Sequence, residues 1–439
     1  MPATSGFRIV PPWVGNGWLT TAIPRGGTSG IRSVASRRPA IRRDSSLTSE
    51  ASLSRGTSVA GRVSQCPTVS GFRAAGRAVL FGVFLASCAS GRGTAGDVIH
   101  PTGAPPLVDT VIQSGLSVPW DIAFAPDGRL FMTERIGDIV MFESAKPNAK
   151  RVGVMKVPDV HAMGEAGLMG IALDPDFATN GFLYVCASRM DSGEWLNQIL
   201  RYRAGVDSMT FDSYVIRTGA QAASIHDGCR LRFGPDGKLW ATMGENGNGR
   251  LAQDPNSLNG KILRMNPDGT VPADNPTLAG ASARTYAYSM GHRNPQGLAF
   301  QPSTNVIYEI EDGATTNDEI NILVAGKNYG WPDREGMGGM TKGFTDPIWT
   351  SGDVTYATSG ATFVTGDQWG AWSGSLLVAT LKEQDVRRFE VSGTTVIQKE
   401  TLYDGKYGRL RSIVQGPDGA IYATTSNGSG DRIVRIAPQ

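Results

Sequence analysis

One of the four histidines of this 439-residue chain, His226, stands where its side chain could perform acid–base chemistry. It comes just before the strand-like run 229–233, in a segment that we expect to be a loop. Imidazole titrates near neutral pH, and a loop side chain is free to face a ligand, so His226 could take a proton from a bound molecule. A lone loop histidine is more often structural, so this hypothesis needs reactive partners at the same position.

Cationic side chains occupy the corresponding place beside other strand-like runs. These residues are Arg293 with Asn294 before one run, Lys382 after another, and Arg409 and Arg411 at the start of the last. Guanidinium groups bind carboxylates through two parallel hydrogen bonds, and they are tolerated in a buried place only when paired. Together with the histidine, this set favours an anionic, planar ligand.

Acids and small residues share the same positions. Glu165 precedes a further strand-like run, and Asp312 belongs to the acidic loop 311–321. Carboxylates and exposed carbonyl groups are the oxygen ligands that Ca²⁺ prefers, so this loop could hold the ion, although it lacks the EF-hand spacing. An acidic loop is usually only solvated, and it is the recurrence at one position of successive units that favours a shared site.

A repeated unit explains how residues so far apart in sequence could meet. Each unit has an apolar run, a turn that contains proline, and a second apolar run. The turn prolines are Pro126, Pro175, Pro235, Pro302 and Pro417. A degenerate copy at 361–380 fills the last interval, which gives six units of about 58 residues. The sequence therefore predicts an all-β fold, a six-bladed β-propeller of four-stranded antiparallel blades, in which loops from every blade converge at one end of the channel.

The first 88 residues differ from the rest in composition, with 11 Arg, no Lys and only two acids. We divide the chain into an extension that is disordered or precedes the true translation start, a lipoprotein-type signal peptide, a linker and the propeller domain. Their bounds are 1–70, 71–88, 89–105 and 106–439. Cys88 closes a lipobox-like Leu-Ala-Ser-Cys, which predicts lipid anchoring in a bacterial periplasm or cell envelope; the alternative is an ordinary signal peptide.

Without those 88 residues the chain keeps 31 basic and 38 acidic residues, a net charge of −7. The overall charge of +2 belongs to the leader, so no argument for binding nucleic acid remains. Two further cysteines, Cys186 and Cys229, lie in strand-like runs, and their spacing does not tell whether they pair.

Several short motifs occur in consistent order between about Val118 and Ala437. They are His226 with the run 230–237, the segment 259–264, Gly-His-Arg-Asn-Pro-Gln-Gly at 291–297, Asp-Glu-Ile-Asn at 318–321 and Asn-Tyr-Gly-Trp-Pro at 328–332. As a combination they resemble the soluble pyrroloquinoline quinone (PQQ) dependent glucose and aldose sugar dehydrogenases, also called the glucose/sorbosone dehydrogenase family.

The resemblance implies a role for each loop residue. His226 would take the proton from the C1 hydroxyl of an aldose sugar while hydride passes to the quinone, which gives the lactone. Arg293 and Asn294 would polarise the quinone oxygens. The remaining binding residues would be Lys382, Arg409 and Arg411 for the carboxylates and oxygens of PQQ, and the carbonyls of Gly313 and Ala314 for the catalytic Ca²⁺.

Two acids depart from the family pattern. Glu165 stands where relatives carry Gln near the substrate, and Asp312 where they often carry Gln or His. Both are therefore expected to face the sugar and to alter the sugar preference. In the stretch 344–360, Trp349 and Thr355 are the candidates for further cofactor contacts. The implied partners are an aldose and an electron acceptor that the sequence does not identify, with membrane contact only through the lipid anchor.

Two other functions are open on the same fold: a non-enzymatic propeller that binds carbohydrate or protein, and a calcium-dependent lactonase. Neither needs one imidazole and four cations at the same end of the channel. The five residues are His226, Arg293, Lys382, Arg409 and Arg411. Their joint presence favours the dehydrogenase.

Overall fold

Pro-Asp-Gly turns join the first two strands in three of the sheets. Each of these turns begins at Pro126, Pro235 or Pro417 and ends at a glycine with positive φ, which is 93° at Gly128. Proline presets φ at the first turn position and glycine adopts the left-handed conformation without strain, so these sequences fold into hairpins.

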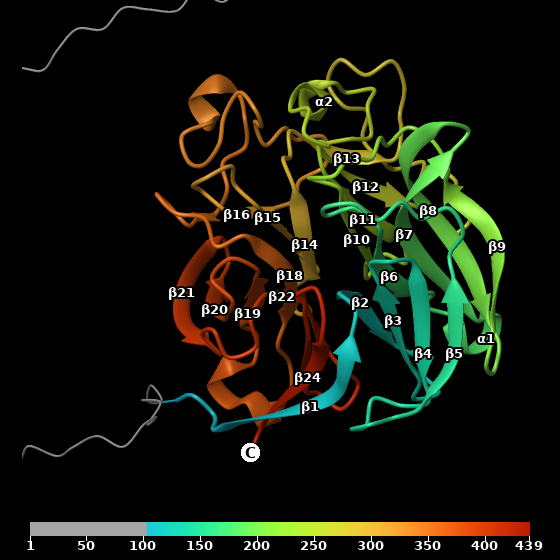
Figure 1. The fold of residues 1–439 in the computed structure, drawn as a ribbon. Coiled ribbons are helices and arrows are strands. Elements are labelled where there is room, and N and C mark those ends of the chain that lie inside the picture. Colours follow the sequence, from blue (N-terminus) through green and yellow to red (C-terminus); the bar gives the residue numbers. More distant parts are fainter. Residues whose placement is uncertain (1–102) are drawn as a thin grey trace, which may run out of the picture. The chain divides into compact units, whose positions relative to one another are not determined.

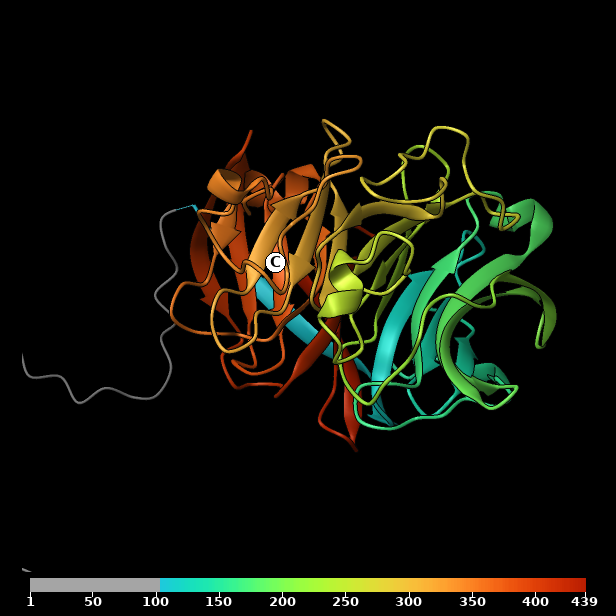
Figure 2. The ribbon, with the colours of Figure 1, turned by 90° about the horizontal axis from the view of Figure 1, so that it is seen from above.

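The computed structural model describes residues 103–439, which form six four-stranded antiparallel sheets arranged in a ring (Figure 1). Figure 2 shows the same blades from a perpendicular direction. The predicted six-bladed β-propeller is confirmed. The predicted extension at 1–70, the signal peptide at 71–88 and most of the linker at 89–105 lie outside the described residues.

Each blade contributes one strand to the wall of the channel and three strands farther out. The inner strands are β2 (Pro119–Phe124), β6 (Leu168–Leu173), β10 (Gly228–Phe233), β14 (Pro295–Phe300), β18 (Thr358–Phe363) and β22 (Leu410–Gln415). The second strands are β3 (Leu130–Glu134), β7 (Phe182–Asp191), β11 (Leu239–Met243), β15 (Ile307–Glu311), β19 (Leu376–Thr380) and β23 (Ile421–Thr425).

The third strands are β4 (Asp138–Phe142), β8 (Glu194–Ala204), β12 (Lys261–Met265), β16 (Glu319–Ile322), β20 (Val386–Ser392) and β24 (Asp431–Pro438). The outer strands are β5 (Arg151–Lys156), β9 (Met209–Ile216), β13 (Ala287–Met290), β17 (Trp349–Thr350), β21 (Thr395–Leu402) and β1 (Leu107–Leu116).

Helices are few and short in the part of the chain that the structure describes. They are α1 (Phe177–Asn180), α2 (Arg250–Gln253) and the 3₁₀ turns η1 (Met340–Lys342) and η2 (Asp367–Trp372). None of the helices within residues 103–439 has the length and apolarity needed to cross a membrane.

Both ends of the described chain build the sixth blade. The C-terminal strands β22, β23 and β24 are completed by β1, which pairs antiparallel with β24 from Leu107 opposite Pro438 to Leu116 opposite Asp431. The two strands lie side by side at the lower edge of Figure 1. This pairing completes the sixth blade with a strand from the other end of the described chain and so closes the ring.

Apolar side chains fill the spaces between neighbouring blades, whereas a polar network crosses the channel. Asp121 of β2 is fully buried and pairs with Arg230 Nη1 at 2.9 Å and Arg232 Nη1 at 2.7 Å, both from β10. Its Oδ1 also accepts from Ser412 Oγ of β22 at 2.6 Å. Burial alone would raise the pKa of Asp121, but the two guanidinium groups hold it below the usual value. One carboxylate thus links the first, third and sixth blades.

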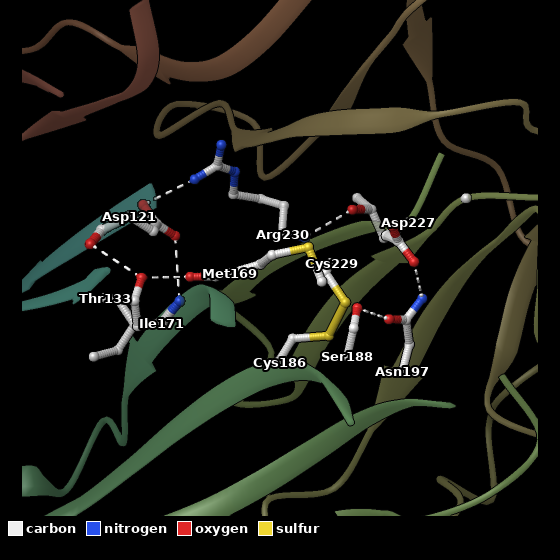
Figure 3. Close-up of a disulfide and its surroundings, with 12 residues drawn as sticks. Asp121, Thr133, Met169, Ile171, Cys186, Ser188, Asn197, Asp227, Cys229 and Arg230 are labelled. Carbon is white, nitrogen blue, oxygen red and sulfur yellow. Dashed lines mark hydrogen bonds and ion pairs between the residues drawn. A yellow bond between two sulfur atoms is a disulfide. The ribbon is translucent and has the colours of Figure 1, made fainter. Parts of the chain in front are cut away.

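The structure answers the question that the cysteine spacing left open. Cys186 of β7 and Cys229 of β10 form a disulfide with a Cα–Cα distance of 5.6 Å, between the second and third blades (Figure 3). Both cysteines are fully buried among the apolar side chains that separate these blades.

Candidate active site

The connections that carry the predicted site residues all open at one end of the ring. In an antiparallel blade, the loop that leads into the inner strand and the turn between the second and third strands lie at the same end. Glu165 precedes β6, His226 precedes β10 and Arg293 precedes β14, while Asp312 follows β15 and Lys382 follows β19. The antiparallel strand order therefore brings these residues together.

Glu165 connects three of these loops. Its Oε2 accepts from the backbone N–H of His226 at 3.0 Å and from Asn294 Nδ2 at 3.2 Å. Asn294 also donates to Asp312 Oδ2 at 3.4 Å. Residues predicted from separate motifs of the second, third and fourth blades are thus joined by hydrogen bonds.

His226 is held by a carboxylate that sequence reasoning missed. Its Nδ1 lies 2.6 Å from Oε1 of Glu245, which follows β11 and is buried. The His226 side chain is 14% exposed. A buried carboxylate on Nδ1 fixes the ring orientation and keeps the proton on that nitrogen, so Nε2 is left to accept a proton from a ligand. The sequence does carry a signal for Glu245. It stands just after the second strand of its unit, the place that Asp312 takes in the next unit.

The guanidinium of Arg293 donates hydrogen bonds to main-chain carbonyl groups of the acidic loop. Its Nη1 donates to Asp312 O at 3.0 Å and to Gly313 O at 2.8 Å, and its guanidinium lies 5.3 Å from the ring centre of Trp331. Ala314 is exposed, and its N–H donates to Glu335 Oε1 at 2.6 Å. The predicted Gly313 carbonyl thus faces the site.

The pKa of Asp312 is affected by several charged groups around it. Burial raises its pKa well above the usual value, the carboxylates of Asp318 and Glu165 raise it further, and Arg293 and Arg411 oppose the shift. Five of the charged groups at this end of the ring therefore act on one another electrostatically.

Arg411 is the most deeply buried of the predicted cations. It is 5% exposed, donates through Nη1 to Gln296 Oε1 and lies 5.5 Å from the ring centre of Trp120. Burial lowers the pKa of Arg411 to about 10, while the carboxylates of Glu165 and Asp312 favour the charged form. No carboxylate lies within ion-pair distance of Arg411 among residues 103–439.

Lys382 and Arg409 lie at the rim, where both are exposed. Lys382 Nζ donates to Thr355 O at 2.9 Å, and Arg409 Nη1 donates to Leu381 O at 3.4 Å. Thr355 in turn donates through Oγ1 to Asp318, which accepts from the N–H of Gly313. Hydrogen bonds through Thr355 therefore connect Lys382 to the acidic loop, whereas Arg409 is bonded to the neighbouring rim residue Leu381.

Trp349 has a different position. It lies on the outer strand β17, where its ring packs edge-on against Phe389 of the fifth blade with 4.9 Å between ring centres. It therefore belongs to the apolar layer between the fourth and fifth blades, whereas Thr355 reaches the acidic loop.

Several buried polar atoms of the site have no hydrogen-bond partner within residues 103–439. These atoms are Glu245 Oε2, Arg293 Nε, Asn294 Oδ1 and Arg411 Nε. Buried polar atoms are nearly always paired, so four unpaired ones on neighbouring loops leave hydrogen-bonding capacity that a polar ligand could use. Two of the four are guanidinium donors, which suits oxygen atoms on that ligand.

An acidic cavity lies beside Gly313. Its volume of about 10 Å³ suits a single small occupant. Four acids line it, Glu311, Asp312, Glu319 and Glu335, together with the cations Arg293 and Arg334. Burial is the main cause that raises the pKa of Glu311 and of Glu319 to about 8. A hard cation such as Ca²⁺ would stabilise oxygen ligands that lie so close together.

Comparisons with known proteins agree with this geometry. Residues 116–435 match the profile of the Glucose / Sorbosone dehydrogenase family. The aldose sugar dehydrogenase YliI of Escherichia coli (strain K12) is 31% identical over 354 residues, which cover 76% of this chain and 94% of that protein.

Two solved structures show the same similarity. A glucose dehydrogenase-type oxidoreductase from Thermus thermophilus is 35% identical with a TM-score of 0.68, covering 75% of this chain and all of that one. The PQQ-bound aldose sugar dehydrogenase of Streptomyces coelicolor is 33% identical with a TM-score of 0.65, covering 76% and 99% of the two chains.

Proposed function

Because the chain belongs to the glucose/sorbosone dehydrogenase family, we propose that it is a PQQ-dependent quinoprotein that oxidises an aldose sugar at C1 to the lactone. The observation that carries this proposal is the pair of guanidinium groups, Arg293 and Arg411, which have unpaired buried Nε donors and belong to or adjoin connections at the same end of the ring as His226. PQQ carries carboxylates and quinone oxygens, which are acceptors for such donors.

His226 acts as the general base. Glu245 holds the proton on Nδ1, so Nε2 takes the proton from the C1 hydroxyl of the sugar. Glu165 and Asp312 face the sugar from the second and fourth blades, and their carboxylates accept from its other hydroxyl groups.

When bound, PQQ supplies the two-electron acceptor and Ca²⁺ supplies a Lewis acid. Arg293 and Asn294 would donate to the quinone oxygens. The carboxylates would be held by Lys382, Arg409 and Arg411, and the carbonyls of Gly313 and Ala314 would ligate Ca²⁺. The charges complement one another, since a ligand with several carboxylates would offset the buried cation that has no ion-pair partner.

The absorbance spectrum of the purified protein tests the proposal. We expect the spectrum of PQQ to change on binding in the presence of Ca²⁺ and to change again when an aldose is added. Binding of PQQ without any response to a series of aldoses would favour the non-enzymatic propeller. Hydrolysis of a lactone without bound PQQ would favour the calcium-dependent lactonase.

Removal of metal is expected to abolish most of the activity of the PQQ-loaded protein, and added Ca²⁺ should restore it. Oxygen ligands select hard cations, and the two described cysteines are joined in a disulfide and cannot bind zinc as thiolates. Turnover of apoprotein reconstituted with PQQ, with and without chelator, measures this. Full activity in excess chelator would contradict the calcium requirement.

Export to the periplasm or cell envelope is part of the proposal. A buried disulfide is typical of proteins that fold in an oxidising compartment, which supports export. If Cys88 carries the lipid, the variant Cys88→Ser should lose membrane partitioning and keep its thermal unfolding temperature. Fractionation of cells that express either form tests the anchor. Equal partitioning of both forms would argue against it.

A further inference from the structure

The loop that carries His226 has an uncommon backbone. His226 and Cys229 are non-glycine residues with φ of 58° and 65°, and Gly228 between them has φ of 67°. The left-handed region is uncommon for residues with a Cβ atom and persists only when surrounding contacts hold it. Something other than local preference must therefore fix this turn.

The ladder of its own blade provides only part of that hold. The pairing of β10 with β11 is interrupted between Gly228 and Leu231, so the intervening residues stand out of register. Such a bulge bends the strand and re-aims the residues before it. The position of His226 is consequently not determined by the third blade alone.

The second blade supplies the missing restraints. Cys229 is bonded to Cys186 of β7, and the side chain beside the base, Asp227, accepts at Oδ1 from Asn197 Nδ2 of β8 at 3.1 Å. Asn197 Oδ1 accepts from Ser188 Oγ of β7 at 2.5 Å. Figure 3 shows this polar chain running alongside the disulfide.

Besides the hydrogen bond that the His226 N–H donates to Glu165 Oε2, described above, the second blade thus holds this turn through the polar chain and through the disulfide, and the polar chain is the weaker of these last two. Asp227 is buried, yet its second oxygen, Oδ2, has no hydrogen-bond partner within residues 103–439. A buried carboxylate with one oxygen unpaired is disfavoured in its charged form, so the strength of these hydrogen bonds depends on its protonation. The covalent bond to Cys186 is therefore the restraint that does not depend on the charge of Asp227.

We propose that the Cys186–Cys229 disulfide is a positioning element for the reaction, holding the left-handed turn 226–229 against the second blade so that His226 Nε2 faces the sugar. This inference rests on the proposed role of His226 as general base. It differs from a stability role because the bond lies three residues from the base and joins the two blades that flank it. Misplacement by about 1 Å can cost roughly 100-fold in rate, so a tether at this point has a catalytic effect.

The test compares the wild type with the double variant Cys186→Ser and Cys229→Ser. At saturating PQQ, Ca²⁺ and aldose, and at a temperature where circular dichroism shows the fold intact, we expect kcat to fall about 10- to 100-fold. The affinity for PQQ should stay within about twofold, since the cations that hold it lie on other loops. If the double serine variant does not fold, the double variant Cys186→Val and Cys229→Ala is used in its place. Its two side chains are apolar, as the buried position requires.

A matched control separates position from stability. Val434→Ala makes a cavity in the apolar cluster of the fifth and sixth blades, far along the ring from His226. This variant should lose stability and keep kcat. A cysteine variant that retains kcat, or loses it only in proportion to its unfolded fraction, would overturn the proposal.

A second readout needs neither cofactor nor activity. In apoprotein labelled at histidine, the NMR resonance assigned to His226 through His226→Gln should shift or broaden in the cysteine variant, while that of the buried His292 should not. An unchanged His226 resonance would overturn the positioning role. If the wild type oxidises no aldose but this resonance does move, the proposed function fails and the structural tether stands.

Discussion

Replacing His226 with Gln is expected to lower kcat by about 10²–10⁴-fold at saturating PQQ and Ca²⁺, the usual contribution of a positioned base. Gln has nearly the reach of His and can still hydrogen-bond to Glu245, so the loop should keep its shape. It cannot take a proton from the C1 hydroxyl. The affinity for PQQ should change little, because the charges of the cofactor are held by other residues.

The substitution Arg411→Ala is expected to have the opposite effect, on cofactor binding rather than on turnover. The Arg411 guanidinium is buried without a carboxylate partner in residues 103–439, so its removal should weaken PQQ binding by about 2–5 kcal/mol. At cofactor concentrations that saturate this variant, kcat should remain close to that of the wild type. PQQ titrations measure the cofactor affinity of both variants, and turnover at saturating PQQ measures their kcat. If His226→Gln loses affinity for PQQ and Arg411→Ala does not, the roles assigned to these two residues are wrong.

Replacing Asp121 with Asn is expected to lower the free energy of unfolding by about 3–5 kcal/mol, because it leaves the fully buried guanidinium of Arg230 and the partly buried one of Arg232 without their counter-charge. The amide keeps the size of the side chain, so no cavity accounts for the loss. Urea unfolding followed by fluorescence measures it. The same network should make the wild type sensitive to acid: the lowered pKa of Asp121 adds stability above the unfolded value of about 3.9, and this stability is lost as pH falls below it.

Asp127→Asn provides the control for that experiment. Asp127 also pairs with an arginine, Arg129, but it lies in an exposed turn where its side chain is 48% accessible. An exposed pair contributes about 0–1 kcal/mol, so this variant should unfold almost like the wild type. Equal effects of the two substitutions would mean that the channel network does not stabilise the ring.

The architecture could be predicted because its signals are local. Pro126-Asp127-Gly128 and its copies specify hairpins through the φ values of proline and glycine, and their recurrence counts the blades. The loop residues could be predicted for the same reason. His226 and Arg293 precede the inner strands of successive blades and Asp312 follows a second strand, and the antiparallel strand order puts both kinds of place at the same end of the ring.

What could not be predicted depends on contacts between blades. The role of Asp121 follows from arginines more than 100 residues away, and the separation of Asp121 and Arg232 is 111 residues. The pairing of Cys186 with Cys229 depends on which strands face each other across a blade boundary. The packing of the Trp349 ring against Phe389 likewise depends on which blades are neighbours.

The completion of the sixth blade by β1 determines when the ring can form. The backbone N–H of Val118 donates to Asp431 Oδ2 across 313 residues, so this end of the chain must wait until nearly all of the rest has been synthesised and moved across any membrane. Contacts this distant in sequence form slowly. Until they form, β24 presents an unpaired edge that can join another chain, so a chaperone that covers this edge would increase the yield of folded protein.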